Sequence, residues 1–271
     1  MTVRTRNPVA LLAAGVLVAT VGLTLVLVAG LAWTSPAEVE LAGYATSLRE
    51  RSTSQRHNAR LAARALNGTI VAPGATFSFN RTVRSWTVDR GYVKAPVSYD
   101  GELVRAFGGG VCQTSTTLYN AALLAGLSII ERHPHVFAPA YVSPGRDAAV
   151  AQYDIDLRFG NPYPWPVRLQ ARVHGERLEV HVYGRERPAA TFEVATELLG
   201  AAAPARLTVT AGETARLNGR VVLRSPGATG YRVATYRLVS ERGTVVRREL
   251  LSEDAYQAAN RIVMLRQAQA P

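Results

Sequence analysis

The 271-residue sequence contains a single cysteine, Cys112, which excludes an intramolecular disulfide. A lone thiol outside the cytoplasm is an inert core residue, half of an intermolecular bridge or a reactive group. Cys112 follows three glycines, Gly108 to Gly110, and precedes a run rich in hydroxyl and apolar side chains, residues 113–127. Why the only thiol stands there is the first question that the sequence raises.

Lysine is almost absent as well, and Lys94 is the only one. The formal net charge of +11 therefore comes almost entirely from arginine. Such a charge favours anionic surfaces such as phosphate-bearing cell-wall polymers or lipid headgroups, although an arginine-rich proteome explains it equally well. The basic residues are scattered and form no stripe interleaved with aromatic side chains, so nucleic-acid binding is not expected.

Charge of either sign is missing from residues 8–33, PVALLAAGVLVATVGLTLVLVAGLAW. A helix of this length spans the roughly 30 Å hydrocarbon core of a bilayer. Arg4 and Arg6 precede it and no acidic residue occurs before Glu38, so the positive-inside rule predicts a cytoplasmic N-terminus, residues 1–7. The sequence thus predicts a single-pass membrane protein with an extracytoplasmic main domain. A signal peptide cleaved near Gly30-Leu31-Ala32 is the alternative.

Two helices are predicted in the folded part. The first covers residues 54–66, where alanine and leucine recur at helical spacing before Asn67-Gly68. The second follows Cys112 and ends at Gly126. This arrangement places the cysteine at a helix N-terminus.

Strands are predicted for most of the remaining chain. Short strands are expected at residues 69–73, 76–80, 91–99 and 102–107, with Asp100-Gly101 as a hairpin turn, and a further hairpin turns at His174-Gly175. A looser stretch, residues 185–205, leads to a β module with a hairpin around Glu241-Arg242-Gly243. The expected fold class is α+β, with a mixed core and a small β-rich C-terminal module.

The surroundings of Cys112 favour a reactive thiol. A helix N-terminus lowers a cysteine pKa from about 8.5 toward ~3.5–7.5. Gly109 and Gly110 let a substrate approach the main chain, and their N–H groups are candidates for an oxyanion hole. Gln113, Thr114 and Ser115 add hydrogen-bond donors. The alternative is that Cys112 packs as a small apolar residue, as buried free cysteines commonly do.

A cysteine nucleophile needs a base, and His135 is the preferred candidate, with His133 second. Both flank Pro134 in an extended segment that follows the strand after the cysteine helix. Arg146 and Asp147, after a Ser-Pro-Gly turn, are candidates for binding a substrate carboxylate and for orienting a histidine, or else they form a structural ion pair. No third ligand stands at metal-site spacing and no P-loop is present, so no cofactor is expected.

Four segments together resemble the VanW domain family, which is named after an accessory protein of vancomycin-resistance clusters. They are LNGTIVAPGATFSFN, GGGVCQTSTTLYNAALLAGL, ERHPHVFAPAYVSPGRDAAV and DLRFGNPYPWPV. The resemblance covers residues 42–184, and residues 227–265 resemble a G5-like β tail, with a linker and strands, residues 185–226, between them. Ser143 and Ala149 depart mildly from the family pattern beside Arg146-Asp147.

The resemblance implies a cell-envelope role. Family members studied as enzymes are peptidoglycan L,D-transpeptidases, and their nucleophile corresponds to Cys112. Such an enzyme takes a stem tetrapeptide, releases its terminal D-alanine, forms a thioester and passes the acyl group to the amine of a neighbouring stem as a 3→3 cross-link. A cysteine peptidase with the same residues, and a non-catalytic wall-binding or scaffold module, remain the alternatives.

Overall fold

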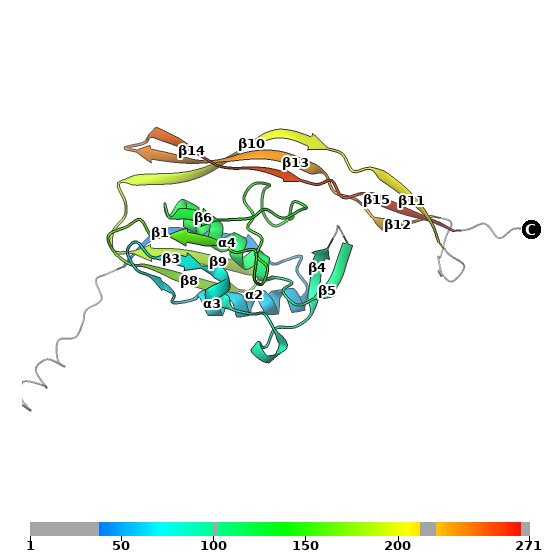
Figure 1. Cartoon of the computed structure of the whole chain (residues 1–271), viewed down its shortest axis with the longest axis horizontal. Helices are drawn as coiled ribbons and strands as arrows, with labels where there is room; N and C mark the ends of the chain where they lie inside the picture. The colour runs from blue at the N-terminus through cyan, green and yellow to red at the C-terminus, as the bar shows by residue number, and fades with distance from the viewer. Residues whose placement is uncertain (1–37, 100–101, 212–220, 267–271) are drawn as a thin grey trace, which may run out of the picture. The chain divides into compact units, whose positions relative to one another are not determined.

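A computed structural model describes residues 38–99, 102–211 and 221–266 (Figure 1). The predicted membrane segment, residues 8–33, lies outside these ranges. Within them, no helix is both long enough and apolar enough to cross a bilayer. The described chain is strand-rich with few helices, as expected for a mixed α and β fold.

A four-stranded antiparallel sheet with two helices forms the core. Its strand order is β1 (Val39–Ser47), β9 (Arg177–Gly184), β8 (Val167–His174) and β2 (Ile70–Val71). The predicted hairpin is β8–β9, which turns through Gly175 at φ +56°. Side chains of β8 and β9 alternate between buried and less buried positions, so one face of the sheet is available to cover a core.

Helix α2 (Thr53–Leu66) confirms the first predicted helix. Ser52 accepts a hydrogen bond from the Gln55 N–H while the Gln55 side chain bonds back to Ser52, a capping box that fixes where the helix begins. The buried face consists mostly of alanine, so α4 can approach α2 closely.

Helix α4 (Val111–Leu124) is the second predicted helix and begins one residue before Cys112. Nearly all its side chains are buried, because β1, β9, α2 and β10 (Ala190–Ala202) all contact it. An amphipathic stripe would not suit a helix surrounded in this way. The thiol therefore lies at the start of the most enclosed helix among the described residues.

A small sheet and a hairpin complete this part of the chain. The sheet has the order β3 (Thr76–Ser78), β7 (Arg158–Gly160) and β6 (Ser128–Glu131), and the rings of Phe77 and Phe159 stack at 4.5 Å. The strand predicted for residues 76–80 is too long, because Ser78 caps a short helix, α3 (Phe79–Val83). The predicted hairpin is β4 (Ala95–Tyr99) and β5 (Glu102–Ala106), whose turn lies outside the described residues.

The C-terminal strands form two three-stranded sheets. One has the order β10, β13 (Gly230–Glu241) and β14 (Thr244–Tyr256), and the other β11 (Arg206–Ala211), β15 (Arg261–Arg266) and β12 (Val221–Ser225). The expectation of a looser stretch at residues 185–205 was wrong, since it contains the 13-residue strand β10. β10 is stabilised by pairing with β13 along its whole length, and the sequence of β10 alone gives no clear strand signal. The predicted β13–β14 hairpin turns through Arg242 and Gly243, both at positive φ.

Candidate active site around Cys112

The glycine turn before α4 allows three segments to meet closely. A Cβ atom at Gly109 would lie 2.5 Å from the carbonyl oxygen of Pro96. Gly110 has φ +99°, and a Cβ there would overlap the carbonyl oxygen of Gln55 in α2. The buried Asn58 amide donates to the carbonyl of Gly109 at 2.9 Å and so ties the turn to α2. The position of α4, and with it the thiol, is set by these contacts.

Three side chains form a hydrogen-bonded chain that begins at Cys112. The partly exposed thiol bonds the imidazole of His135, and its sulfur lies 3.4 Å from the carbonyl oxygen of Val150. His135 Nδ1 lies 2.6 Å from Asp147 Oδ2, and the backbone N–H of His135 donates to the same oxygen at 2.8 Å. Because Asp147 occupies Nδ1, the other ring nitrogen, Nε2, is left for the thiol.

The electrostatics of this chain favour the charged forms. Burial raises the pKa of the Cys112 thiol, but the hydrogen bond and positive charge of His135 prevail and hold this pKa below its usual value. Burial lowers the pKa of His135, whereas its hydrogen bonds to Asp147 and Cys112 raise it to about 10. Thiolate and imidazolium therefore stabilise each other, and the thiolate is the nucleophilic form.

Asp147 is itself held by Tyr256 of β14 and by Arg132, which directly follows β6. Its Oδ1 accepts hydrogen bonds from the Tyr256 hydroxyl at 2.5 Å and from Arg132 Nη2 at 3.0 Å. Arg132 Nη1 in turn lies 2.6 Å from Asp254 Oδ2. Burial raises the pKa of Asp147, but the hydrogen bond from His135 and the nearby charges outweigh it and keep this pKa below its usual range. The C-terminal sheet thus completes the surroundings of the site.

Two cavities open beside the thiol. One of about 290 Å³ is lined by Cys112, His135 and the following residues: Arg51, Gln55, Pro96, Val97, Gly108, Gly109, Gly110, Gln113, Phe137, Ala138, Pro139, Ala140 and Tyr141. A second of about 400 Å³ is also lined by Cys112, together with Trp86, Thr87, Val97, Phe107, Gly108, Val150, Ala151 and Gln152. A reacting group at the sulfur can therefore be approached from two directions.

Comparison with known proteins identifies the part of the chain that holds this site. Residues 54–183 match the family described as VanW like protein. This region is similar to the VanW family. A G5 domain match covers residues 208–265, so it begins earlier than the predicted β tail at residue 227. Cys112, His135 and Asp147 all belong to the VanW-like domain, whereas Tyr256 comes from the G5 segment.

Two curated relatives match the VanW-like region. YoaR of Bacillus subtilis is 40% identical over 147 residues, which are 54% of this chain and 48% of YoaR. The vancomycin B-type resistance protein VanW of Enterococcus faecalis is 33% identical over 144 residues, 51% of this chain and 52% of that protein. The match thus spans about half the length of each relative.

Solved structures match the G5 segment. The G5 domain of HP0197 is 24% identical, covers 29% of this chain and 99% of that chain, and has a TM-score of 0.17. The G5 domain of an IgA1 protease is 20% identical, covers 31% of this chain and 96% of that chain, and has a TM-score of 0.22.

The two candidate histidines of the VanW-like domain lie in different surroundings. His135 is the one beside Cys112. The side chain of His133 is 43% exposed, and its Nε2 lies 3.1 Å from Glu131 Oε1. Of the two histidines, therefore, only His135 lies beside the thiol, whereas His133 pairs with Glu131. Backbone pairing of His133 with Ala149 helps to hold this segment against the Asp147 loop.

The candidate donors that follow Cys112 separate in the same way. Gln113 lines the smaller cavity, although its amide nitrogen donates to Thr46 Oγ1 at 3.1 Å and to the Ser47 carbonyl. The expectation that the side chains of Thr114 and Ser115 bind substrate was wrong, because both residues are 0% exposed. Their hydroxyls donate to backbone carbonyl oxygens inside the protein, because α4 is enclosed on all sides.

Arg146 does not contact the cavity, so its expected role as a carboxylate ligand is not supported by its position. Its Nε donates to Asn120 Oδ1 at 2.7 Å, and its guanidinium lies over the Tyr44 ring at 5.0 Å. The arginine that lines the cavity is Arg51, which follows β1 and which sequence reasoning missed. No local motif marks Arg51, since only the packing of β1 and α2 brings it near Cys112.

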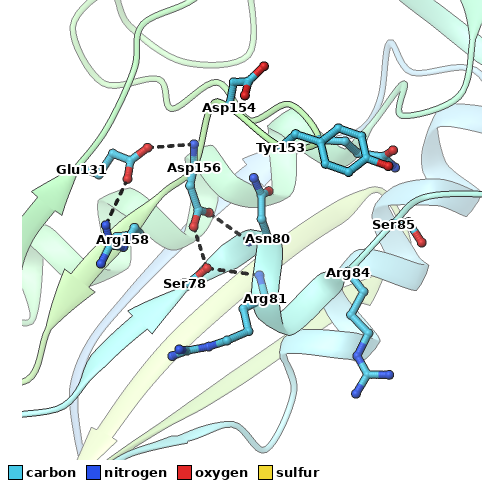
Figure 2. Close-up of a pocket in the computed structure, with 11 residues that line it drawn as sticks. Ser78, Asn80, Arg81, Arg84, Ser85, Glu131, Tyr153, Asp154, Asp156 and Arg158 are labelled. Carbon is cyan, nitrogen blue, oxygen red and sulfur yellow. Dashed lines mark hydrogen bonds and ion pairs between the residues drawn. The ribbon is translucent and has the colours of Figure 1, made fainter.

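A larger, polar cavity of about 710 Å³ lies between α3, β6 and β7 (Figure 2). Its carboxylates are mostly satisfied: Asp156 accepts from Ser78 Oγ at 2.5 Å, and Glu131 lies 3.5 Å from Arg158. Cys112 is not among its lining residues, although Gln152 lines both this cavity and the second one beside the thiol. Within the described ranges, no group of three or more potential ligand side chains is placed to hold a metal ion.

Proposed function

We propose that this protein is a cell-envelope cysteine acyltransferase, an L,D-transpeptidase that joins peptidoglycan stem peptides by 3→3 cross-links. The observation that carries the proposal is the series Cys112–His135–Asp147, with a buried Asp147 and a partly exposed thiol, at the edge of two cavities. An activated nucleophile, a base and a group that orients the base are the parts that acyl transfer requires. The name of the VanW relative adds a link to vancomycin resistance.

In the first half-reaction, the Cys112 thiolate attacks the carbonyl carbon of the third stem residue. Gly110 provides no side chain to cap α4, so the N–H groups of Cys112 and Gln113 can stabilise the tetrahedral oxyanion. When the intermediate collapses, the bond to the terminal D-alanine breaks. The leaving amine takes a proton from the His135 imidazolium, and a thioester remains on Cys112.

In the second half-reaction, the side-chain amine of a neighbouring stem attacks the thioester carbonyl. Neutral His135 now accepts the proton of the attacking amine, the carbon–sulfur bond breaks, and the thiolate and imidazolium are restored. Asp147 keeps the imidazole in one tautomer throughout. The two cavities beside the sulfur suit a reaction in which donor and acceptor approach from different sides.

The location belongs to the same proposal. Residues 8–33 would anchor the protein in the cell membrane and leave residues from about 34 onward outside it. The site would then face the peptidoglycan from the membrane side. The net charge of +11 would favour the anionic polymers and lipids found there.

The test uses the chain from Ser35 onward, purified disaccharide-tetrapeptide and mass spectrometry. We expect a cross-linked dimer that lacks one D-alanine, and none with Cys112→Ala. Thr114→Ser is the matched control, because it alters a buried hydroxyl residue two positions away and keeps the hydroxyl. D-alanine release without dimer would replace the transferase by a cysteine peptidase.

The result that refutes both enzymes is specific. Folded wild-type protein that releases no D-alanine, forms no thioester detectable by intact mass and still binds purified cell wall would be a wall-binding module. In that case Cys112 would have a packing role only. The thioester mass is decisive because it does not depend on which acceptor is supplied.

A further inference from the structure

Arg51 occupies an unusual place in the smaller cavity beside Cys112. It follows the strand β1, and its guanidinium lies over the ring of Tyr141 at 5.2 Å. Its Nε atom is buried and has no hydrogen-bond partner among the described residues. Buried donors are nearly always paired, so an unpaired guanidinium N–H at a cavity wall calls for an acceptor from elsewhere.

The surroundings make this guanidinium a strong anion ligand. Arg51 is the only arginine that lines the cavity, and the wall from Phe137 to Ala140 is mostly apolar. An ionic hydrogen bond strengthens in such surroundings because fewer water molecules compete for it. The described ion pairs include none between Arg51 and a carboxylate, in contrast to Arg132, which is held by Asp147 and Asp254.

We infer that Arg51 binds the terminal carboxylate of the acyl-donor peptide. The inference rests on the proposed function and names the donor class: a peptide with a free C-terminal carboxylate one residue beyond the bond that Cys112 attacks. A cavity of about 290 Å³ has room for such a terminal residue between Arg51 and the thiol. Tyr141 supports the guanidinium from below and would keep it oriented while the donor binds.

Two consequences separate this arrangement from a merely cationic surface. Donors whose C-terminus is amidated or extended lose the ionic hydrogen bond and should react poorly. The acceptor, which is recognised by its amine, gains nothing from Arg51. Arg51 is therefore a residue that decides donor specificity, and its removal should raise the donor KM more than it changes the second half-reaction.

The first experiment does not require the transpeptidase substrate. Cys112 is alkylated with iodoacetate, which carries a carboxylate, and with neutral iodoacetamide, and the ratio of the two rates is measured. Changes in the thiol itself affect both reagents alike and cancel in the ratio. We expect Arg51→Gln to lower the iodoacetate-to-iodoacetamide ratio about tenfold, the size of one charge-assisted hydrogen bond.

Arg146→Gln is the matched control, since Arg146 is bonded to Asn120 away from the cavity and should leave the ratio unchanged. Arg51→Lys keeps the charge and should restore part of the ratio. An unchanged ratio in Arg51→Gln, or an equal drop in Arg146→Gln, overturns the inference. Thermal unfolding of each variant shows that the comparison is made between folded proteins.

The second experiment compares donor tetrapeptides with a free and an amidated C-terminus. We expect the wild type to prefer the free acid and Arg51→Gln to lose this preference. Equal use of both donors by the wild type overturns the inference while leaving the transferase intact. If no donor reacts but the alkylation ratio falls in Arg51→Gln, the anion site stands and the proposed transpeptidase fails.

Discussion

The hydroxyl of Tyr256 provides the most direct test of how the G5 segment supports the site. It donates to Asp147 Oδ1 at 2.5 Å, and it accepts the N–H of Gly145 at 2.8 Å and Arg132 Nη2 at 3.4 Å. Tyr256→Phe removes all three bonds and keeps the ring. A hydrogen bond to a charged group contributes about 1.5–3 kcal/mol, and the Gly145 N–H loses its acceptor as well. Together these losses should lower the free energy of unfolding by about 2–4 kcal/mol.

For a chain of this size, 1 kcal/mol changes the melting temperature by roughly 2–4 °C, so Tyr256→Phe should melt roughly 5–15 °C lower. Thermal and urea unfolding measure the change. Tyr231→Phe is the control, because Tyr231 pairs with Tyr256 across β13 and β14 and its hydroxyl makes no hydrogen bond with the described residues. A loss below about 0.5 kcal/mol, equal to that of the control, would refute the role assigned to Tyr256.

Three further predictions follow from the same site. The rate of Cys112 alkylation by iodoacetamide should rise with pH and reach half its maximum below pH ~8.5. His135→Ala should move this midpoint above that value, because burial then raises the thiol pKa with no imidazolium to lower it. The pKa of Asp147 is lowered from its ordinary 3.8, so its ionisation stabilises the fold above that pH, and this stabilisation is lost as the pH falls through the pKa of the folded state. In urea unfolding measured from pH 5 downward, Asp147→Asn should therefore reduce the loss of stability at acid pH. Gly110→Ala should lower the melting temperature far more than Gly175→Ala, because its Cβ would overlap the Gln55 carbonyl whereas nothing lies within 4 Å of one at Gly175.

Local features of the structure could be read in the sequence with good accuracy. Helix α2 begins beside its capping box and ends at Asn67, close to the predicted residues 54–66. The predicted β8–β9 and β13–β14 hairpins both turn where glycine allows positive φ, at Gly175 and Gly243. Capping and turn geometry depend on residues close together in the chain, so their signals survive without knowledge of the fold.

Long-range pairing left much weaker signals. The stretch that contains β10 was expected to be loose, yet it forms a long strand because β13 pairs with it. Likewise, Thr114 and Ser115 have the composition of a polar binding loop. They are buried because β1, β9, α2 and β10 surround α4, a fact that no window of the sequence contains.

The sequence by itself determined the nucleophile candidate, its place at a helix N-terminus and the short list of residues around it. Cys112, His135 and Asp147 lie within one stretch of the chain, so motif reasoning could name all three. Only the tertiary structure placed His135 rather than His133 beside Cys112, put Arg51 rather than Arg146 at the cavity, and brought Tyr256 to Asp147 from 109 residues away. The direction of a side chain, its burial and its contacts with distant residues depend on how sheets and helices pack, and packing is a property of the whole chain.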